Sequence, residues 1–474
     1  MSNNYIPTIG LEIHLETKSK SKMFSSAPNT YGAKPNTSVL PIDLGMPGTL
    51  PTVNEEAVKN AIKLSHALHM KIDHTLHFDR KNYFYSDLPK GYQITQNERP
   101  IGSDGYLDFQ LDGSSVRVEI ERLHMEEDTC KQLHYTDFTL LDYNRAGVPL
   151  CEIVTRPCIH DARVARLYVE KIREIGIYLD VSDGKMEEGS LRCDVNISIA
   201  KEGAKEFGTK VEIKNLNSTA NVEKAIAYEI ERQKSLLENG EKVRQETRRF
   251  DESKMETVLM RVKTDAVDYK YFPEPNILPI KLSDEFVNDT IGSSYELADV
   301  KFARYTNVFK VSEYDANTLL KNRSLALLFD DAAKTCQYYD LLIHFINGDV
   351  LTYVSGANNV FNLSGKHLGE LINLVGENKI SNAQARDIFK VIAKDNKSPI
   401  DIVSEQGITQ ISDEDTLKEM INKLLDENPQ AIEDFKNGKG RAASFLVGQI
   451  MKLTKGKANP ALASKLINEE LKRR

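Results

Sequence analysis

The segment Ile9–Glu16, with the sequence IGLEIHLE, alternates strictly between apolar and polar residues. Because a β-strand has a side-chain period of two, this segment predicts a strand with one apolar and one polar face. The polar face carries two carboxylates and an imidazole, from Glu12, His14 and Glu16. Taken alone, the pattern also fits a half-buried strand whose outer face is solvated. Later strands with complementary groups favour a site built on a sheet.

The segment VRVEIERLHMEED, residues 116–128, predicts a second strand, which ends in adjacent acidic residues. Its apolar residues change parity near Glu121 and Arg122, and a β-bulge there would reconcile the two halves. Adjacent acids repel one another and need either full solvation or a cation. The end of this strand is therefore either a solvated surface or a candidate cation-binding position.

Two further segments, LRCDVNISI (191–199) and TKVEIKNLNS (209–218), alternate in the same way and are close enough in sequence to form a hairpin. Their polar faces mix acids with cations. Hard oxygen ligands with one imidazole suit Mg²⁺ or Mn²⁺ better than structural zinc. The predicted metal ligands of all these strands are Glu12, His14, Glu126, Glu127, Asp194 and Glu212.

The loop FDRKNYFYSDLPKGYQITQ, residues 78–96, crowds cations and aromatic rings around an Asp-Leu-Pro-Lys-Gly turn. It suits a flat anionic ligand, or else a solvated loop supported by aromatic packing. Cations beside a metal site are what phosphoryl transfer requires, since that chemistry needs mainly positioning and charge stabilisation. The side chains that could neutralise phosphate oxygens are those of Lys81, Lys90, Arg192, Lys210 and Lys214, and Tyr83 adds an aromatic ring to the loop.

The sequence contains neither a P-loop nor a G-x-G-x-x-G motif, which excludes the two commonest nucleotide-binding loops. The same residues would also serve a metal-dependent hydrolase, and the side-chain chemistry does not separate the two classes. Five scattered cysteines without a C-x-x-C pair support neither a disulfide framework nor a four-thiolate zinc site. The N-terminus is polar, and no apolar run approaches the roughly 18 residues of a membrane span. We expect a cytoplasmic protein that does not enter a membrane.

The pattern of elements predicts an α+β protein with a sheet-based N-terminal domain followed by helices. Helices are expected after Asn54, after Asp161 and from about Thr219 to Asn239. The proline-rich stretch 268–280 marks a change to short amphipathic helices. The predicted domains are residues 1–293, a helical domain of residues 294–400 and a helical tail of residues 401–474.

The net charge of the chain is −8, so a nucleic acid would have to bind a local basic patch. The segment Lys436–Arg474 contains ten Lys or Arg and two acidic residues, which gives it a net charge of +8. This local asymmetry predicts a patch of that kind in the tail. A solvated helix surface is the plainer interpretation.

The chain resembles the B-subunit family of the aspartyl/glutamyl-tRNA amidotransferases over essentially its whole length. Beside the segments already quoted, the resemblance rests on DLGMPGTLP, RLHMEEDT, DYNRAGVPLCEIVTRP, EGSLRCDVNIS, QETRRFDES, DYKYFPEPN and FLVGQIMKLTKGKANP. Ser86 stands where the family usually has Pro, and a family Trp is missing near residues 343–350. Neither difference affects a predicted ligand.

The resemblance implies a sheet-based cradle domain, a helical domain and a small tail domain. It implies a glutamine-dependent ligase that phosphorylates the side-chain carboxylate of Glu-tRNA(Gln) or Asp-tRNA(Asn) with ATP and Mg²⁺, then amidates it with ammonia. A partner amidase (the glutaminase, or A-type, component) would supply the ammonia, and a small C-type component would complete the heterotrimer. Catalytic roles fall on Glu12, His14, Glu126 and Glu212. The residues that would bind ATP or the aminoacyl-tRNA 3′ end are Lys81, Tyr83, Lys90, Arg192, Lys210 and Lys214. In the tail, Lys452, Lys455 and Lys457 would bind tRNA.

Two rival classes of function fit parts of the sequence. A non-catalytic tRNA-binding scaffold would be favoured if the acidic strand faces were solvated surface. A self-sufficient glutamine amidase would need a nucleophile site, and Cys151, Cys158 and Cys193 lie beside apolar residues as ordinary buried thiols do.

Overall fold

The structure is a computed structural model that describes residues 5–262, 268–356, 363–406, 414–436, 441–454, 458 and 460–474. The chain divides into two compact units, Met1–Leu297 and Ala298–Arg474. The first unit carries the sheets and the second is helical, which confirms the predicted α+β class. None of the helices in these described ranges is long and apolar enough to cross a membrane. The three-domain division at residues 293 and 400 stays a prediction.

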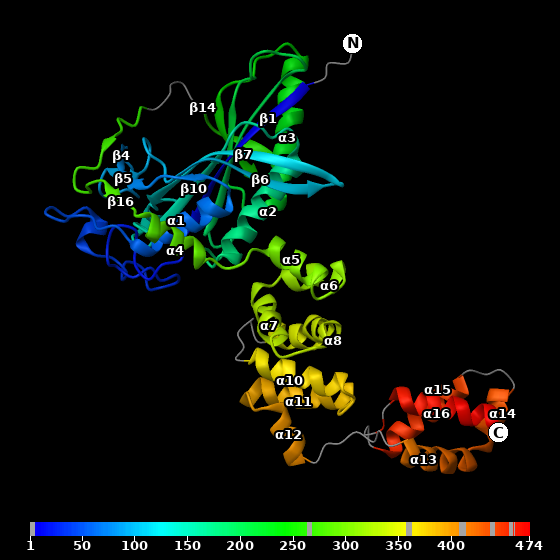
Figure 1. The fold of residues 1–474 in the computed structure, drawn as a ribbon. Helices are drawn as coiled ribbons and strands as arrows, with labels where there is room; N and C mark the ends of the chain where they lie inside the picture. The colour runs from blue at the N-terminus through cyan, green and yellow to red at the C-terminus, as the bar shows by residue number, and fades with distance from the viewer. Residues whose placement is uncertain are drawn as a thin grey trace. The chain divides into compact units, whose positions relative to one another are not determined.

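The main sheet of the first unit consists of strands drawn from the whole length of that unit. Their bounds are β1 Tyr5–Glu16, β2 Lys71–Ile72, β6 Gly102–Leu111, β7 Ser114–Glu127, β10 Pro149–Thr155, β11 Leu191–Lys201, β12 Val211–Lys214, β13 Glu246–Asp251 and β14 Glu256–Val262. Among the described residues this sheet has nine strands in the order β14-β13-β12-β11-β1-β10-β7-β6-β2 (Figure 1). β1 pairs antiparallel with β10 and β11 and so lies at the centre. The predicted hairpin is confirmed by antiparallel pairing of β11 with β12.

Helices pack on one face of this sheet and leave the other face for polar groups. The helices of the first unit are α1 Glu55–Ala67, α2 Ala162–Tyr178, α3 Thr219–Glu238 and α4 Asp284–Gly292. The odd-numbered apolar residues of β1, Ile9 to Leu15, are at most 1% exposed and share one core with residues of α1, α2 and α3. Figure 1 shows α2 and α3 running beside the strands. Because β1 buries its odd positions, Glu12 and His14 must point to the opposite face.

The helix starts expected from the sequence are confirmed by their caps. The side chain of Asn54 accepts hydrogen bonds from the backbone N–H groups of Glu56 and Ala57, and Asp161 accepts one from Arg163. Such caps satisfy N–H groups that lack partners within the helix. α3 ends at Glu238, immediately before the predicted Asn239 stop.

The predicted bulge in β7 is also confirmed. Val154 of β10 pairs with Arg122, but the next residue, Thr155, pairs with Ile120, so Glu121 is the extra residue. Val118 and Ile120 on one side of the bulge and Leu123 and Met125 on the other all join the core. The bulge therefore lets both halves of β7 bury their apolar residues while Glu126 faces away from the helices.

In its described residues the first unit also contains three smaller sheets and a short 3₁₀ helix. Their bounds are η1 Pro41–Leu44, β3 Thr75–Leu76, β4 Asp79–Asn82, β5 Tyr92–Thr95, β8 Lys131–His134, β9 Thr139–Asp142, β15 Phe272–Pro273 and β16 Ile280–Lys281. The pairings are β15-β4-β5, β16-β3 and β8-β9. Glu274 in the proline-rich stretch forms a bidentate ion pair with Arg80 of β4, at 2.6 and 3.0 Å. That stretch is therefore anchored within the first unit, whose last residue is Leu297.

The second unit is built from helices. They are α5 Ala298–Asn307, α6 Glu313–Leu320, α7 Arg323–Ala333, α8 Tyr339–Phe345, η2 Ile346–Val350, α9 Leu351–Gly356, α10 Gly365–Gly376, α11 Asn382–Asp395, α12 Pro399–Gln406, α13 Glu414–Glu427, α14 Pro429–Lys436, α15 Arg441–Leu453 and α16 Pro460–Arg473. Leu417 and Ile421 of α13, Leu446 of α15 and Ile467 of α16 belong to one buried cluster, which the last four helices form among themselves.

Candidate functional site

The register of β1 decides which polar side chains meet. Glu12 lies opposite Asp194 on β11, and His14 lies opposite Arg192 on β11 and Glu152 on β10. The side chains that share the polar face of the sheet form two neighbouring groups, one around each of these two residues of β1. Directly paired residues of adjacent strands have Cβ atoms only about 4.5–5.5 Å apart, so the register alone brings the groups together.

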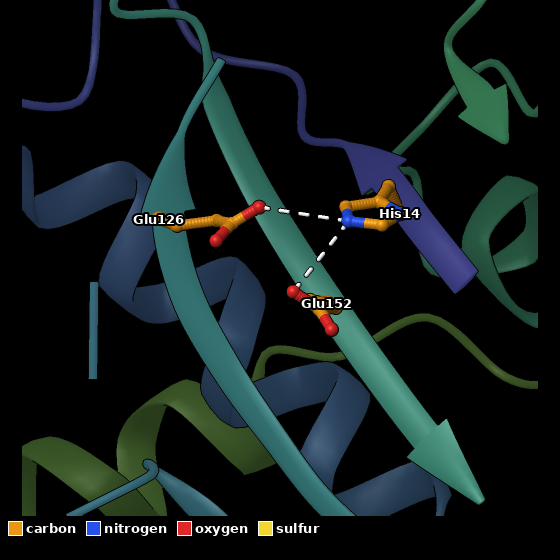
Figure 2. A group of neighbouring side chains, drawn as sticks. All are labelled: His14, Glu126 and Glu152. Atoms are coloured by element: carbon orange, nitrogen blue, oxygen red, sulfur yellow. Dashed lines mark ion pairs between the residues drawn. The ribbon is translucent and has the colours of Figure 1, made fainter. Parts of the chain in front are cut away.

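The first group, here called the histidine group, consists of His14, Glu126 and Glu152. Nε2 of His14 lies 3.8 Å from Oε1 of Glu126 and 3.5 Å from Oε2 of Glu152. Figure 2 shows the three side chains pointing toward one another from the adjacent strands β1, β7 and β10. Glu126 is 3% exposed and Glu152 is 9% exposed. Two nearly buried carboxylates need a cationic partner, because an unpaired buried charge is costly.

A second imidazole completes the charge balance of the histidine group. Nε2 of His124 lies 3.1 Å from Oε2 of Glu152 and 3.7 Å from Oε2 of Glu126. Burial opposes the charged imidazole, but Glu152 and Glu126 outweigh it and raise the pKa of His124 to about 9. Burial also opposes the charged form of His14, but Glu152 and Glu126 outweigh burial and raise the pKa of His14. The imidazolium of His124 therefore places a positive charge beside both carboxylates.

The second group, here called the carboxylate group, consists of Glu12, Asp194 and Glu212. It offers three ligand oxygens that all lie within 4.8 Å of one another. Its side chains are fixed by neighbours: Nδ2 of Asn196 donates to Oε1 of Glu12 at 2.7 Å, and Oγ1 of Thr247 donates to Oε2 of Glu212 at 2.8 Å.

Lys214 supplies the positive charge of the carboxylate group. Its Nζ donates to Oδ2 of Asp194 at 2.5 Å and lies 3.2 Å from Oε1 of Glu212. Burial opposes its charge, but Asp194 and Glu212 outweigh burial and raise the pKa of Lys214. The ammonium therefore stays charged within the group.

Glu127, the remaining predicted metal ligand, joins neither group. Its Oε1 accepts from the Nζ of Lys90 and from the backbone N–H of Ile94, the latter at 3.0 Å. Both side chains of this ion pair are nearly buried, with 11% of Lys90 and 6% of Glu127 exposed. The structure thus pairs a predicted metal ligand with a predicted phosphate-binding lysine.

A cavity of about 1170 Å³ opens on the polar face of the sheet. It is lined by His14, Glu126 and Asp194 of the two groups. Four of the residues predicted to bind ATP or a tRNA 3′ end also line it, namely Lys81, Tyr83, Arg192 and Lys214. Nζ of Lys81 lies 4.9 Å from the ring centroid of Tyr269, a cation–π contact.

The other predicted anion-binding residues lie elsewhere. Lys90 does not line this cavity, and Lys210 is exposed and does not line it either. In the tail, Lys452 is exposed on α15, whereas Lys455 and Lys457 lie outside the described residues. The assignment of these residues to ATP or tRNA stays a prediction.

A cluster of two arginines and two carboxylates lines another part of the cavity. Nη2 of Arg192 donates to Oδ2 of Asp128 at 2.8 Å, and Arg145 lies 3.4 Å from the same oxygen. Burial and the neighbouring Asp128 raise the pKa of Glu16 to about 8, despite the opposing charge of Arg192. Glu16 therefore holds a proton at neutral pH beside the charged Asp128.

Sequence reasoning missed Glu152, His124 and Thr247. Glu152 is an isolated acid in PLCEIVT, every residue of which is buried. A lone carboxylate in the middle of an apolar strand was the signal that could have revealed it, because such a group needs a partner. Thr247 carried no such signal, because its role depends on the parallel pairing of β12 with β13.

A third set of possible ligands has a structural explanation. His77, Asp79 and Glu98 also come close together. However, Oδ2 of Asp79 accepts from the backbone N–H groups of Asn97 and Glu98 at 2.8 and 2.9 Å, so this carboxylate fixes a turn.

The donor atoms of the two groups suit a hard divalent cation. The histidine group offers one imidazole and two carboxylates, and the carboxylate group offers oxygens alone. Mg²⁺ and Mn²⁺ prefer such ligands, whereas structural zinc sites favour thiolates. The cysteines do not contribute, since burial raises the pKa of Cys151 to about 12 and raises that of Cys193 as well. Such thiols are inert as nucleophiles.

Comparison with known proteins places the chain in a family. Residues 7–288 match the sequence model described as the GatB/GatE catalytic domain, and residues 327–471 match the GatB domain. The catalytic-domain match contains both the histidine group and the carboxylate group. The chain therefore belongs to the GatB/GatE family, which confirms the resemblance seen in the sequence.

Full-length relatives agree with this assignment. The chain is 47% identical over 468 residues to a protein of Mesoplasma florum, covering 98% of each chain. It is 46% identical over 469 residues to one of Macrococcus caseolyticus, covering 98% of this chain and 99% of the relative. A third, from Oceanobacillus iheyensis, is 44% identical over 475 residues, covering 99% of this chain and all of the relative. Each is named as the B subunit of an aspartyl/glutamyl-tRNA(Asn/Gln) amidotransferase.

Proposed function

We propose that this chain is the component of a glutamine-dependent tRNA amidotransferase that activates and amidates the misacylated tRNA. The main support for the proposal is that two acidic groups lie at one cavity and that each is paired with cationic side chains. In this reaction ATP transfers its γ-phosphoryl group to the side-chain carboxylate of Glu-tRNA(Gln) or Asp-tRNA(Asn), which releases ADP. Ammonia then attacks the acyl carbon and phosphate leaves, giving the amide.

The chain's own residues have distinct roles in this proposal. Glu12, Asp194 and Glu212 would hold one divalent cation, and His14, Glu126 and Glu152 would hold another. A bound divalent cation would supply positive charge to the phosphate oxygens. Phosphoryl transfer needs little covalent work from the protein, so the main contributions are position and charge.

The cationic side chains around the cavity would bind the anionic parts of the substrates. Lys81 and Arg192 reach the cavity, and the pKa of each is raised because neighbouring carboxylates outweigh the effect of burial. Both therefore remain charged and able to neutralise phosphate oxygens. The aromatic ring of Tyr83 offers a flat surface for a base or an adenine ring.

The scaffold alternative is not favoured. It required the acidic strand faces to be solvated, whereas Glu126 and Glu152 are at most 9% exposed. The amidase alternative lacks support because Cys151 and Cys193 are buried thiols of raised pKa. We therefore propose that ammonia comes from the partner amidase of the A type, with the small C-type component in the same heterotrimer.

The proposal is tested by assaying the purified complex on both misacylated tRNAs with and without ATP. Formation of Gln-tRNA or Asn-tRNA should depend on ATP and release one phosphate per amide formed. The isolated chain should release no ammonia from glutamine, yet ammonium salts should replace the amidase activity. Amidation that proceeds without ATP, or glutamine hydrolysis by the isolated chain, would refute the assignment.

A further inference from the structure

The two acidic groups differ in the kind of cation that neutralises them. The carboxylates of the histidine group face the imidazoles of His14 and His124. The carboxylate group is instead paired with the ammonium of Lys214, which contacts Asp194 and Glu212. The cation paired with the carboxylate group therefore belongs to a flexible side chain, whose charged end can leave while its Cα stays in the strand.

The ammonium of Lys214 lies where a divalent cation would have to bind. Its Nζ lies 2.5 Å from Oδ2 of Asp194 and 3.2 Å from Oε1 of Glu212, which is close enough for direct contact with both carboxylates. Mg–O bonds are about 2.1 Å long, so an ion bound by the same oxygens would lie against the ammonium. Two cations at such a distance repel strongly, and the oxygens cannot serve both. Binding of the metal and binding of the ammonium are therefore mutually exclusive.

The side chain of Lys214 has a second position open to it. Lys214 lines the cavity together with Lys81 and Arg192, and about one-third of its side chain is exposed. Its stem has four methylene groups, so the ammonium can swing from the carboxylates into the cavity without movement of β12. In the cavity it would meet anionic ligands.

We propose that Lys214 is an exchangeable cation: it neutralises the carboxylate group in the metal-free protein, and a divalent cation displaces it into the cavity to bind a phosphate. This inference rests on the proposed function, since it takes the phosphate to be that of ATP. Lys214 is a positioning residue that links metal binding to phosphate binding. Divalent cation and nucleotide then bind with positive cooperativity, because each favours the same position of the lysine.

The first test measures Mn²⁺ binding to the full chain by electron paramagnetic resonance, without nucleotide. Lys214→Met removes the competing ammonium, so affinity for the ion at the carboxylate group should rise by on the order of tenfold, a usual size for such coupling. Glu212→Gln identifies that ion by abolishing its signal. Unchanged or weaker Mn²⁺ binding in Lys214→Met would overturn the proposal.

The matched control is Lys131→Met, which removes a positive charge from an exposed lysine that also lines the cavity. If Lys131→Met tightens Mn²⁺ binding as much as Lys214→Met does, the gain comes from the loss of any positive charge near the cavity. That result would refute the exchange. Lys214→Arg keeps the charge and should leave the ion weakly bound. This variant preserves a test even if Lys214→Met fails to fold.

The second test measures binding of a non-hydrolysable ATP analogue to the same proteins. With saturating Mn²⁺, Lys214→Met should bind the analogue on the order of tenfold more weakly than the wild type, because the displaced ammonium is missing. Without a divalent cation the two should bind alike, since the wild-type lysine is then held by Asp194 and Glu212. Equal weakening under both conditions would refute the exchange. Failure of the ATP-dependent assay, with these Mn²⁺ results intact, would instead refute the proposed function.

Discussion

The hydrogen bond from Thr247 to Glu212 offers a sharp test of how the carboxylate group is held. Thr247 is 1% exposed, and its Oγ1 donates to Oε2 of Glu212 at 2.8 Å. Thr247→Val keeps the shape of the side chain and removes the donor. A hydrogen bond to a charged group contributes about 1.5–3 kcal/mol, which corresponds to roughly a 10- to 150-fold change in an equilibrium constant. Loss of residues that orient a metal ligand typically costs about 10- to 100-fold in affinity.

We therefore expect Thr247→Val to weaken Mn²⁺ binding at the carboxylate group by about 10- to 100-fold, measured by paramagnetic resonance titration. Thr247→Ser retains the hydroxyl and should bind Mn²⁺ nearly as the wild type does. Equal binding by Thr247→Val and the wild type would refute the reasoning. Equal weakening by Thr247→Ser would show that the methyl group, rather than the hydroxyl, matters.

A neighbouring threonine provides the matched control. Thr257 is 2% exposed on the adjacent strand β14, and its Oγ1 donates at 2.8 Å to Glu229, a fully buried carboxylate outside both groups. Thr257→Val should lower the free energy of unfolding by at least about 1.5–3 kcal/mol, because it removes this bond and also the one that Nε of Arg248 donates to Oγ1 of Thr257. It should leave Mn²⁺ affinity unchanged, which separates loss of stability from loss of the site.

Three further outcomes are expected. Glu12→Ala should abolish ATP-dependent transamidation while sparing glutamine hydrolysis by the partner; retained transamidation in the coupled tRNA assay would contradict its proposed role. Lys90→Ala should lower the free energy of unfolding in urea by about 3–5 kcal/mol, because it leaves the Glu127 carboxylate buried without its ammonium; Lys90→Ala with Glu127→Gln should recover most of that loss. Deleting residues 401–474 should raise KM for tRNA and flatten its salt dependence, since phosphate contacts release counterions, and undiminished tRNA binding at low salt would make the tail an assembly module.

Local patterns in the sequence predicted which residues share a face but not which residues meet. Alternation in β1 placed Glu12 and His14 on the polar face, and the parity change in β7 located the bulge near Glu121 and Arg122. Pairing between strands is set by distant parts of the chain, however. The register of the strands was therefore needed to show that Glu12 meets Asp194, which lies 182 positions away in the sequence. For this reason the sequence did not show that the predicted ligands lie in two groups, with Glu127 in neither.

Charged residues were the hardest to place, because a charge has several possible partners. Lys90 looked like a phosphate-binding residue, but its ammonium is held by Glu127. Glu152 looked like part of an apolar strand, but it is held between two imidazoles. In each case the partner comes from a different strand or loop, and the energy of the pair depends on burial that the sequence does not display.

The bulge at Glu121 also makes the site sensitive to the length of its strand. Ile120 and Leu123 are three positions apart and face the same core only because the bulge absorbs one residue between them. Removing Glu121 would leave Ile120 and Leu123 two positions apart, so a regular strand would bury both and keep Glu126 on the polar face. Inserting a second extra residue would instead turn over the half of β7 beyond it, unless its pairing with β10 shifted. Position 121 can therefore accept many substitutions and even a deletion, but not an insertion. A lengthened strand would present Leu123 and Met125 to the cavity, and the histidine group would lose Glu126 although every residue of that group remained in the chain.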